Sequence, residues 1–358
     1  MKSKLALFVI SALALGSSAH AAEIFNKDGN KLDLYGKMKG EYDFDGGKGK
    51  HENHDGTYAR LGIKGETQIN NALTGYGQFE YNIPANKPED FQAAAQTRLA
   101  FAGLSYDHIG SIDYGRNYGV LYDIGSYTDT LTEFGGDSYQ LTDNFMNSRA
   151  NSLLTYRAVD GWGYVDGLTF GLQYQGANHN GSFDKQNGQG LGTSLQYTIG
   201  DTGVTVGGAY SHSRAVKAQT FDKTVNGKSA SAWALGTKYD ANGIYAAALY
   251  SQTKNMTPVA QDGSNGGYVL DKTQNIEVMA AYTFDFGLRP SIGYVQSKGQ
   301  FGDLKADVQK YVQIGAAYYF NKNFNIDAGY KINLLGEKSK ELGFKTDNQA
   351  RIGMTYQF

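Results

Sequence analysis

The sequence lacks several features that define common classes of protein. It contains no cysteine and only four prolines in 358 residues, so disulfide bonds contribute nothing to its stability. Beyond its first 21 residues, it has no apolar run near the roughly 18 residues that a membrane-spanning helix requires. It also lacks an excess of positive charge, with a formal net charge of −2, which argues against a nucleic acid as its partner.

The first 21 residues have the pattern of a secretory signal peptide. Lys2 and Lys4 precede an apolar stretch at 5–15, and the tripeptide AHA at 19–21 has the form of a cleavage site. We therefore expect residues 1–21 to be removed and the mature chain to begin at Ala22. Removing the two lysines from the 33 basic residues leaves 31 against 35 acidic residues, a mature net charge of −4.

The residues that are abundant indicate β-structure. The chain has 27 Tyr, 18 Phe and 47 Gly, a composition that favours strands and tight turns over helices. Its mean hydropathy of −0.46 is that of a soluble protein. A transmembrane β-barrel has a similar average, because it turns the polar half of every strand toward its lumen.

Polar and apolar residues alternate along much of the chain. In the C-terminal octapeptide RIGMTYQF, the residues Ile352, Met354, Tyr356 and Phe358 share one face, and polar or small residues occupy the other. Residues 324–334 repeat the pattern. A period of two over this length predicts strands that have one apolar face and one wet face.

Sixteen segments have this period, and the connections between them alternate between short and long. Tight turns at one rim and long loops at the other predict an all-β fold, a 16-stranded antiparallel transmembrane β-barrel. Such a barrel must be closed, because an open sheet edge in hydrocarbon leaves backbone groups unpaired. The segments lie near 31–43, 58–70, 73–83, 97–109, 111–119, 149–158, 168–176, 190–200, 203–213, 230–240, 243–254, 274–285, 288–299, 308–321, 324–335 and 348–358.

The connections also bear on the number of domains. No linker or charge run divides residues 22–358, so we expect a single barrel domain. A soluble β-sandwich would share the period, but it has less reason to keep short and long connections in strict order. The long connections are expected near 44–57, 84–96, 120–148, 177–189, 214–229, 255–273, 300–307 and 336–347.

The alternation predicts which side chains line the lumen. A charge that faces lipid at mid-depth costs roughly 2–4 kcal/mol, so the charged face of each strand is assigned to the inside. In the segment at 97–109, Leu99 and Phe101 are expected to face outward and Arg98 inward. The early strands thus place a group of cations on the inner wall. The candidates for the lumen are Lys37, Tyr58, Arg60, Lys64, Arg98, Arg149 and Arg157, together with Tyr118 and Tyr122.

The longest connection, 120–148, breaks the alternation and is acidic. Gly135 and Gly136 would let its backbone turn sharply. Folded outward, it is one more surface loop; folded inward, it sets its carboxylates against the cationic wall of a narrowed channel. Periodicity alone does not choose between the two. The carboxylates are Asp123, Asp129, Glu133, Asp137 and Asp143.

Several stretches resemble the general diffusion porins of Gram-negative outer membranes, in the osmoporin and matrix-porin group. They include AEIFNKDGNKLDLYGK, TYARLGIKGETQIN, TRLAFAGL, DYGRNYGV, EFGGD, FDFGLRPSIGY and the terminal YQF, and they extend over nearly the whole mature chain. The resemblance implies a homotrimer in an outer membrane, among lipid and lipopolysaccharide. It also implies a passive channel for small hydrophilic solutes and ions that needs no cofactor. From the mature charge of −4 we expect a weak preference for cations.

The resemblance further implies a role for particular residues. The third long loop should fold inward, so that Asp129 and Glu133 face a wall of cations across a constriction. Glu89, in the loop at 84–96, should reach a neighbouring subunit, and the terminal Phe358 should be read by the barrel-insertion machinery. Thr132 stands where the family usually has proline. The cations of the constriction are expected to be Lys37, Arg60, Arg98 and Arg149.

Two other functions are compatible with a barrel. An outer-membrane hydrolase is suggested only by the tripeptide GDS at 136–138, which arises easily by chance. A channel specific for one solute, such as a sugar, would need a track of inward aromatic residues, and Tyr58, Tyr118 and Tyr122 are too few. We therefore expect no catalytic, cofactor-binding or metal-binding residues.

Overall fold

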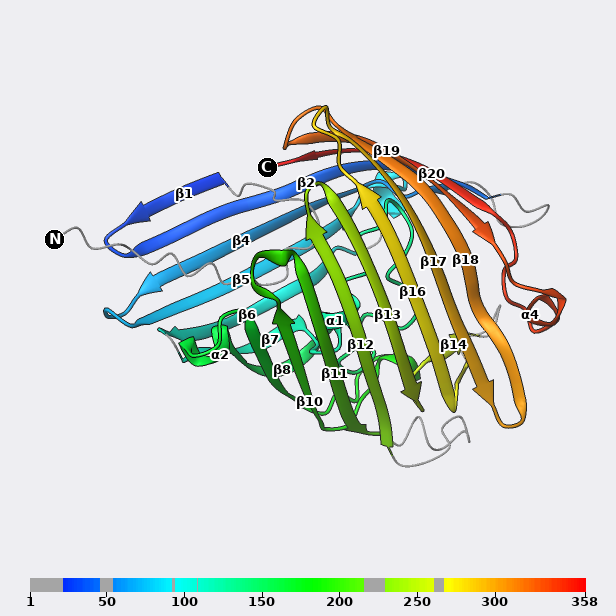
Figure 1. Ribbon diagram of the computed structural model, residues 1–358, viewed down its shortest axis with the longest axis horizontal. Coiled ribbons are helices and arrows are strands. Elements are labelled where there is room, and N and C mark those ends of the chain that lie inside the picture. Colours follow the sequence, from blue (N-terminus) through cyan, green and yellow to red (C-terminus); the bar gives the residue numbers. More distant parts are fainter. Residues whose placement is uncertain (1–21, 46–53, 92–93, 108, 216–228, 261–266) are drawn as a thin grey trace.

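The computed structural model describes residues 22–45, 54–91, 94–107, 109–215, 229–260 and 267–358, and they form a closed antiparallel β-barrel of 16 strands (Figure 1). The predicted fold class is confirmed, and each of the sixteen predicted segments corresponds to one strand. The expected signal peptide, residues 1–21, lies outside the described residues.

In chain order the wall consists of β2 (Asn30–Asp45), β4 (Tyr58–Gln68), β5 (Leu73–Pro84), β6 (Gln96–Tyr106), β7 (Gly110–Tyr118), β8 (Arg149–Ala158), β9 (Leu168–Gln175), β10 (Gly190–Thr198), β11 (Val204–Arg214), β12 (Ser229–Ala241), β13 (Ile244–Lys254), β16 (Lys272–Tyr282), β17 (Leu288–Phe301), β18 (Leu304–Tyr319), β19 (Phe324–Asn333) and β20 (Gln349–Gln357). The shorter elements are β1 (Ala22–Lys27), β3 (His54–Asp55), β14 (Pro258–Ala260), β15 (Gly267–Val269), α1 (Tyr122–Gly125), α2 (Asp160–Gly163), α4 (Glu337–Glu341), η1 (Glu89–Phe91), η2 (Phe183–Lys185) and η3 (Gly200–Thr202).

The barrel closes where β20 pairs with β2, with Lys37 opposite Gln357. The short strand β1 pairs with the other end of β2, where Ala22 lies opposite Leu34. Between these two ladders, Gly36 and Phe358 exchange backbone hydrogen bonds of 3.0 Å in both directions. One position of the wall is therefore filled by two strands, β20 and β1, which lie end to end along β2 (Figure 1).

The outer face of the barrel carries exposed apolar side chains. Aromatic rings gather there near the short turns, with Phe284 and Phe286 5.2 Å apart between ring centroids and Tyr318 and Phe320 5.0 Å apart. This arrangement has the form of an interfacial girdle, in which amphipathic rings border an apolar band.

One predicted long connection is wrong. Residues 300–307 are not a loop, because β17 continues to Phe301 and β18 begins at Leu304, directly opposite. Only Gly302 and Asp303 form the turn, and Gly302 has the positive φ of +57° that so tight a turn demands. Among the helices that the structure describes, none is long and apolar enough to cross a membrane.

A β-bulge changes the expected orientation of two side chains on β6. The register of β5 and β6 shifts so that Glu80 pairs with Leu99 while Tyr81 pairs with Thr97, which leaves Arg98 as the extra residue. Leu99 and Phe101 therefore point into the barrel, and Leu99 is buried. The prediction that they face outward is wrong, because a bulge breaks the strict alternation on which it depended.

Candidate functional site

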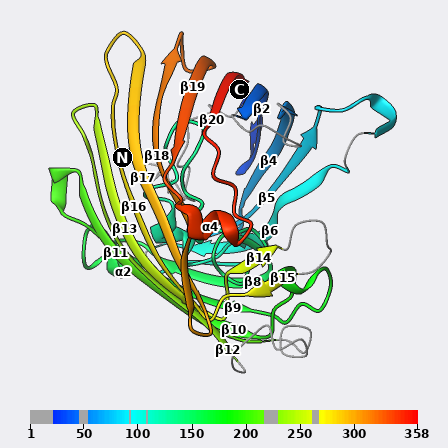
Figure 2. The ribbon, with the colours of Figure 1, turned by 90° about the vertical axis from the view of Figure 1, so that its right-hand side faces the viewer.

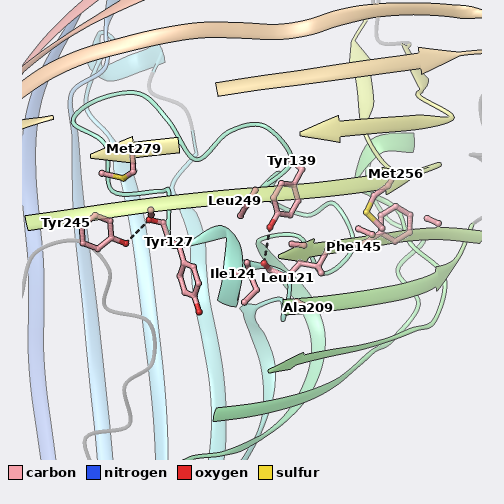
Figure 3. Packing of buried hydrophobic residues seen from close by; sticks show 14 of the residues in the cluster. Leu121, Ile124, Tyr127, Tyr139, Phe145, Ala209, Tyr245, Leu249, Met256 and Met279 are labelled. Atoms are coloured by element: carbon pink, nitrogen blue, oxygen red, sulfur yellow. Dashed lines mark hydrogen bonds between the residues drawn. The ribbon is translucent and has the colours of Figure 1, made fainter. Parts of the chain in front are cut away.

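The third long loop, residues 119–148, lies inside the barrel and is called loop 3 below. Its helix α1 contacts β11 and β12. Tyr127 donates a hydrogen bond to Gln196 Oε1 at 2.6 Å, and Tyr245 donates one to the Tyr127 carbonyl at 2.7 Å (Figure 3). The inward fold of the loop, which the resemblance implied, is confirmed.

Loop 3 is held by a core of buried apolar side chains between it and the wall (Figure 3). A fully buried Leu, Ile or Phe side chain contributes roughly 1.5–3 kcal/mol relative to an exposed one, so several of them fix the loop in place. The loop contributes Leu121, Ile124, Tyr127, Tyr139 and Phe145, and the wall contributes residues that include Ala230, Ala232, Ala234, Ala247 and Leu249.

Small residues on the wall make room for this packing. A Cβ added at Gly207 would lie 2.6 Å from Cδ1 of Ile124, and one added at Gly236 would lie 2.8 Å from Cγ2 of the same residue. A Cβ added at a third glycine, Gly293, would lie 2.4 Å from Cδ1 of Leu131. The inner face of these strands is thus shaped for loop 3, and it is apolar where alternation alone predicts a wet face.

The first anchor of loop 3 is an ion pair. Asp123 is fully buried, and Arg157 on β8 donates to its two oxygens at 2.6 and 2.9 Å. Ser194 on β10 donates a third hydrogen bond of 2.5 Å. Arg157 points inward, as the alternation predicted, and its carboxylate partner comes from the loop.

The second anchor is Glu277 on β16. This buried carboxylate accepts hydrogen bonds from the Thr128 hydroxyl, from the Ser138 backbone N–H at 3.1 Å and from Gln140 Nε2 at 3.3 Å. Glu277 therefore ties the outgoing and the returning halves of loop 3 to one point of the wall.

Asp129 is the next residue after Thr128, and its Oδ2 accepts a 2.5 Å hydrogen bond from Tyr122. Burial raises the pKa of Asp129 to about 7, although the hydrogen bond from Tyr122 opposes the shift.

The innermost turn of loop 3 is centred on Glu133. Its φ is +74°, and Phe134 donates its N–H to the Thr132 carbonyl at 3.0 Å, which makes a three-residue turn. A positive φ outside glycine costs of the order of 1–3 kcal/mol, so surrounding contacts must offset it. Lys39 Nζ lies 2.5 Å from Glu133 Oε1, and Arg351 Nη1 donates to the Glu133 carbonyl at 3.2 Å.

Thr132, which the resemblance marked as standing in place of a proline, adds contacts to the same turn. Its side chain is buried, and its hydroxyl lies 3.1 Å from the Ser291 hydroxyl on β17. Its carbonyl accepts a hydrogen bond from Gln313 on β18. A proline could not form the hydroxyl contact, so the threonine supplies an attachment of its own.

The returning half of loop 3 is attached by its remaining acids. Tyr311 on β18 donates to Asp137 Oδ1 at 2.6 Å, and Arg116 on β7 donates to the two oxygens of Asp143 at 2.5 and 3.0 Å. Burial raises the pKa of Asp137, and the Tyr311 hydrogen bond opposes the shift. Two of the five loop carboxylates, Asp123 and Asp143, are thus paired with arginines that the resemblance did not assign to the constriction.

The four expected cations lie on the inner wall of the early strands. Lys37 and Arg60 are opposite each other on β2 and β4, and both stand over the ring of Tyr58, at 5.5 and 5.1 Å from its centroid. Arg98 Nε donates to Glu80 Oε1 at 2.5 Å, and Arg60 lies 3.8 Å from the same oxygen.

The fourth cation, Arg149, is on β8. It donates to Thr142 Oγ1 of loop 3 at 3.0 Å and stands 5.7 Å from the centre of the Tyr118 ring. Tyr118 and Tyr122 stack, with centroids 4.6 Å apart and an interplanar angle of 15°. Lys64, another predicted lumen residue, stands 5.4 Å from the ring centre of Tyr35.

The order of strands around the barrel sets the acidic and basic groups against each other. Counted from β6, which carries Arg98, the strand halfway round the ring of sixteen is β16, which carries Glu277. Loop 3 is attached to β16 through Thr128, next to Asp129. The attached part of the loop and the arginines on β4, β6 and β8 therefore border the lumen from opposite sides.

The charged residues inside the barrel that sequence reasoning missed include Lys39, Glu80, Glu277 and Arg351. The alternation could have identified Lys39 and Arg351. Lys39 shares the inner face with Lys37, and Arg351 lies on the polar face of the last strand. Glu80 and Glu277 are the single acids of their strands, β5 and β16, and such isolated acids could have been singled out for the cost of burying them.

The residues expected to act outside the lumen lie on the periphery. Glu89 begins the exposed turn η1 in the loop after β5, and that loop projects from the side of the barrel (Figure 2). Phe358 follows β20 on the outer-facing parity, and its ring centroid lies 6.2 Å from that of Tyr356.

Comparisons with known proteins agree with this architecture. The family model described as Gram-negative porin matches residues 27–358. The chain is 52% identical over 361 residues to the outer membrane porin PhoE of Enterobacter cloacae, covering 100% of this chain and 99% of the relative. It is 51% identical over 366 residues to the outer membrane porin F of Salmonella typhi, covering both in full.

Solved structures give the same result. The structure of Salmonella typhi OmpF in complex with daunomycin superposes with a TM-score of 0.88 at 50% identity, covering 94% of this chain and 100% of that one. An anion-selective porin from Comamonas acidovorans shares the fold, with a TM-score of 0.67 at 15% identity over 92% of this chain and 100% of that one. The protein is a passive diffusion channel of the Gram-negative outer membrane and not an enzyme. The chain belongs to the Gram-negative porin family.

Proposed function

We propose that the channel passes small hydrophilic solutes and ions with a weak preference for cations, through a constriction between loop 3 and the arginines of the early strands. The observation that carries this proposal is the opposition of the two sides. Asp129 belongs to the part of loop 3 attached to β16, halfway round the ring from Arg98 on β6. Glu133 belongs to the turn held by Lys39 on β2 and Arg351 on β20, and β2 is the neighbour of the strand that carries Arg60. A narrow aqueous opening between opposed charges orients dipolar solutes and excludes apolar ones.

Local pairing keeps the expected ion preference weak. Glu80 offsets part of the charge of Arg98 and Arg60, and Lys39 offsets part of that of Glu133. The remaining preference for cations comes from the mature net charge of −4, because 35 acidic residues outnumber 31 basic ones. Because exposed lumen charges are screened by salt, the preference should be clearest at low ionic strength.

The proposal is tested by single-channel recording in a planar bilayer with a tenfold gradient of KCl. We expect a reversal potential with the sign of cation selectivity, well below the value for a perfectly cation-selective channel. We also expect small sugars to enter in a liposome-swelling assay. A reversal potential of zero or of the anion sign would reject the cation preference. Absence of channels from folded protein would reject the diffusion function itself.

We also propose a homotrimer among lipid and lipopolysaccharide, with Glu89 as a latch to the neighbouring subunit and Phe358 as a signal for the barrel-insertion machinery. The exposed, projecting η1 turn supports the first role, and the outward terminal aromatic ring supports the second. Light scattering in mild detergent should give three copies, and Glu89→Gln should lower the dissociation temperature. Phe358→Ser should lower the yield in the outer membrane, and unchanged yield would reject that role.

A further inference from the structure

We infer that Lys39 and Arg351 act together as a clamp that holds the innermost turn of loop 3 against β2 and β20, and thereby fixes both the width of the channel and the position of the Glu133 charge. The inference rests on the proposed function, because it concerns the constriction of that same channel. It assigns a positioning role to two residues of the wall.

The first observation is the convergence of charges around Glu133. Its side chain is 1% exposed, although it belongs to a loop in an aqueous lumen. Lys39 Nζ lies 2.5 Å from Glu133 Oε1, 2.9 Å from Glu41 Oε2 and 3.8 Å from Asp327 Oδ1. Lys39 therefore joins the loop to carboxylates on its own strand and on β19.

Arg351 approaches the same turn from β20. Its Nη1 donates to the Glu133 carbonyl at 3.2 Å, and its Nε lies 3.5 Å from Glu133 Oε2. Its guanidinium stands 4.9 Å from the centre of the Phe134 ring. Asp43 accepts two hydrogen bonds from Arg351, one of them from Nη2 at 3.0 Å, and so fixes its orientation.

The second observation is the shape of the wall beneath the turn. A Cβ added at Gly329 would lie 3.0 Å from the Cβ of Glu133, and one added at Gly315 would lie 3.1 Å from the Cβ of Thr132. At Gly353 it would lie 2.8 Å from Cε of Lys39. These glycines, on neighbouring strands, leave a recess that receives the turn and the lysine side chain.

The third observation is the conformation of the turn. Glu133, Gly135 and Gly136 all have positive φ, of +74°, +109° and +62°. Glycine adopts this region without cost and glutamate does not, so the turn at Glu133 needs contacts to persist. The clamp supplies them. Without it, the turn is expected to leave the recess and to carry the Glu133 charge into the lumen.

The test compares Lys39→Met with Lys37→Met. Lys37 is the matched control, because it is an inward lysine two residues away on the same strand and lies over Tyr58. Both variants remove one lumen cation. Only Lys39→Met should increase open-channel current noise, about threefold or more, and speed hydrogen–deuterium exchange in a peptide covering residues 129–137. Arg351→Met should behave like Lys39→Met.

A double-mutant cycle separates the clamp from a plain change of charge. If Lys39 acts through Glu133, then Lys39→Met in a Glu133→Gln background should add little further noise or exchange. The clamp is rejected if Lys39→Met and Arg351→Met show the same current noise and the same loop exchange as Lys37→Met. If the parental channel conducts normally in that case, the proposed function stands. If the parental protein forms no channels, the proposed function fails, and the exchange measurement still decides the clamp.

Variants that fail to reach the folded state are replaced by Lys39→Gln and Arg351→Gln, which keep a polar group in the recess. Folding is checked by heat-modifiable migration in gels before any recording. Loop exchange in these variants equal to that of Lys37→Met would also overturn the inference.

Discussion

Arg157 on β8 donates two hydrogen bonds, at 2.6 and 2.9 Å, to the fully buried carboxylate of Asp123 at the start of loop 3. Removing one partner of a buried ion pair leaves the other charge without compensation, at a cost of about 3–5 kcal/mol. We expect Arg157→Met to loosen loop 3 by that order. Hydrogen–deuterium exchange of residues 120–126 measures the change. The double variant Asp123→Asn with Arg157→Met should exchange more slowly than Arg157→Met alone, and equal or faster exchange would contradict the prediction.

Neutralising the acidic side of the constriction should shift ion preference toward anions. With Asp129→Asn and Glu133→Gln, the cations Arg60, Arg98 and Arg149 lose the loop carboxylates, while Glu80 still offsets part of the charge of Arg60 and Arg98. At 4 Å two unit charges interact by about 4 kcal/mol at an effective dielectric constant near 20, so a few groups dominate the field. Reversal potential under a salt gradient, at low ionic strength, measures the shift. Arg60→Gln with Arg98→Gln should move it the other way, and two unchanged values would show that these residues lie outside the conduction path.

Acidification should weaken the cation preference near neutral pH. Burial raises the pKa of Asp129 to about 7, and burial together with the neighbouring Asp327 raises the pKa of Glu133. An acid with a raised pKa is ionised above that pKa and neutral below it, so negative charge is lost between pH 8 and 5 instead of near pH 4. The reversal potential should therefore move toward anions over this range.

The doubly neutralised loop variant is the control for the pH experiment. Asp129→Asn with Glu133→Gln should show little change of reversal potential between pH 8 and 5, and a change as large as the parental one would assign it to other groups. Since both native pKa values exceed those of the unfolded chain, the native loop binds the extra protons. Loop docking should thus become less stable as pH rises through this window.

A single methyl group on the wall should disturb loop 3. A Cβ at Gly236 would lie 2.8 Å from Cγ2 of Ile124 and 3.0 Å from Cδ2 of Tyr127. Overpacking of this kind typically costs 1–3 kcal/mol, so Gly236→Ala should displace the loop and raise conductance. Gly40→Ala is the control, because its Cβ would meet only Cγ of Met354 at 3.6 Å. Equal conductance in both variants would contradict the packing argument.

Much of the barrel could be predicted from the period of two alone. The alternation around Lys37, Arg60 and Arg157 assigned these side chains to the inside, because a lipid-facing charge is costly. It failed at Leu99 and Phe101, where one extra residue in β6 shifts the register. The expectation of a wet inner face also failed on part of β12, where the inward Ala230, Ala232 and Ala234 are apolar and pack under loop 3.

The loop could be predicted only in part. Its acids were visible in the sequence, but their partners lie far away in the chain, and no local pattern connects Asp123 with Arg157 or Glu133 with Arg351. The inward direction came from the family resemblance. The glycines beneath the loop carried the missing information, since Gly207, Gly236 and Gly293 leave space that only a packed segment fills.

The meeting of β20 and β1 along β2 has a consequence for the covalent design of the barrel. Both run antiparallel to β2, so the chain direction of β20 continues in β1, with Phe358 opposite Gly36 and Ala22 opposite Leu34. Among the described residues, the ladder along β2 thus lacks a partner only opposite Tyr35, between Phe358 and Ala22. If residues 1–21 are removed as predicted, the two ends of the chain meet at this one position of the wall. A circular permutant that joins Phe358 to Ala22 through a single residue and opens the chain in another tight turn would therefore keep every ladder of the cylinder.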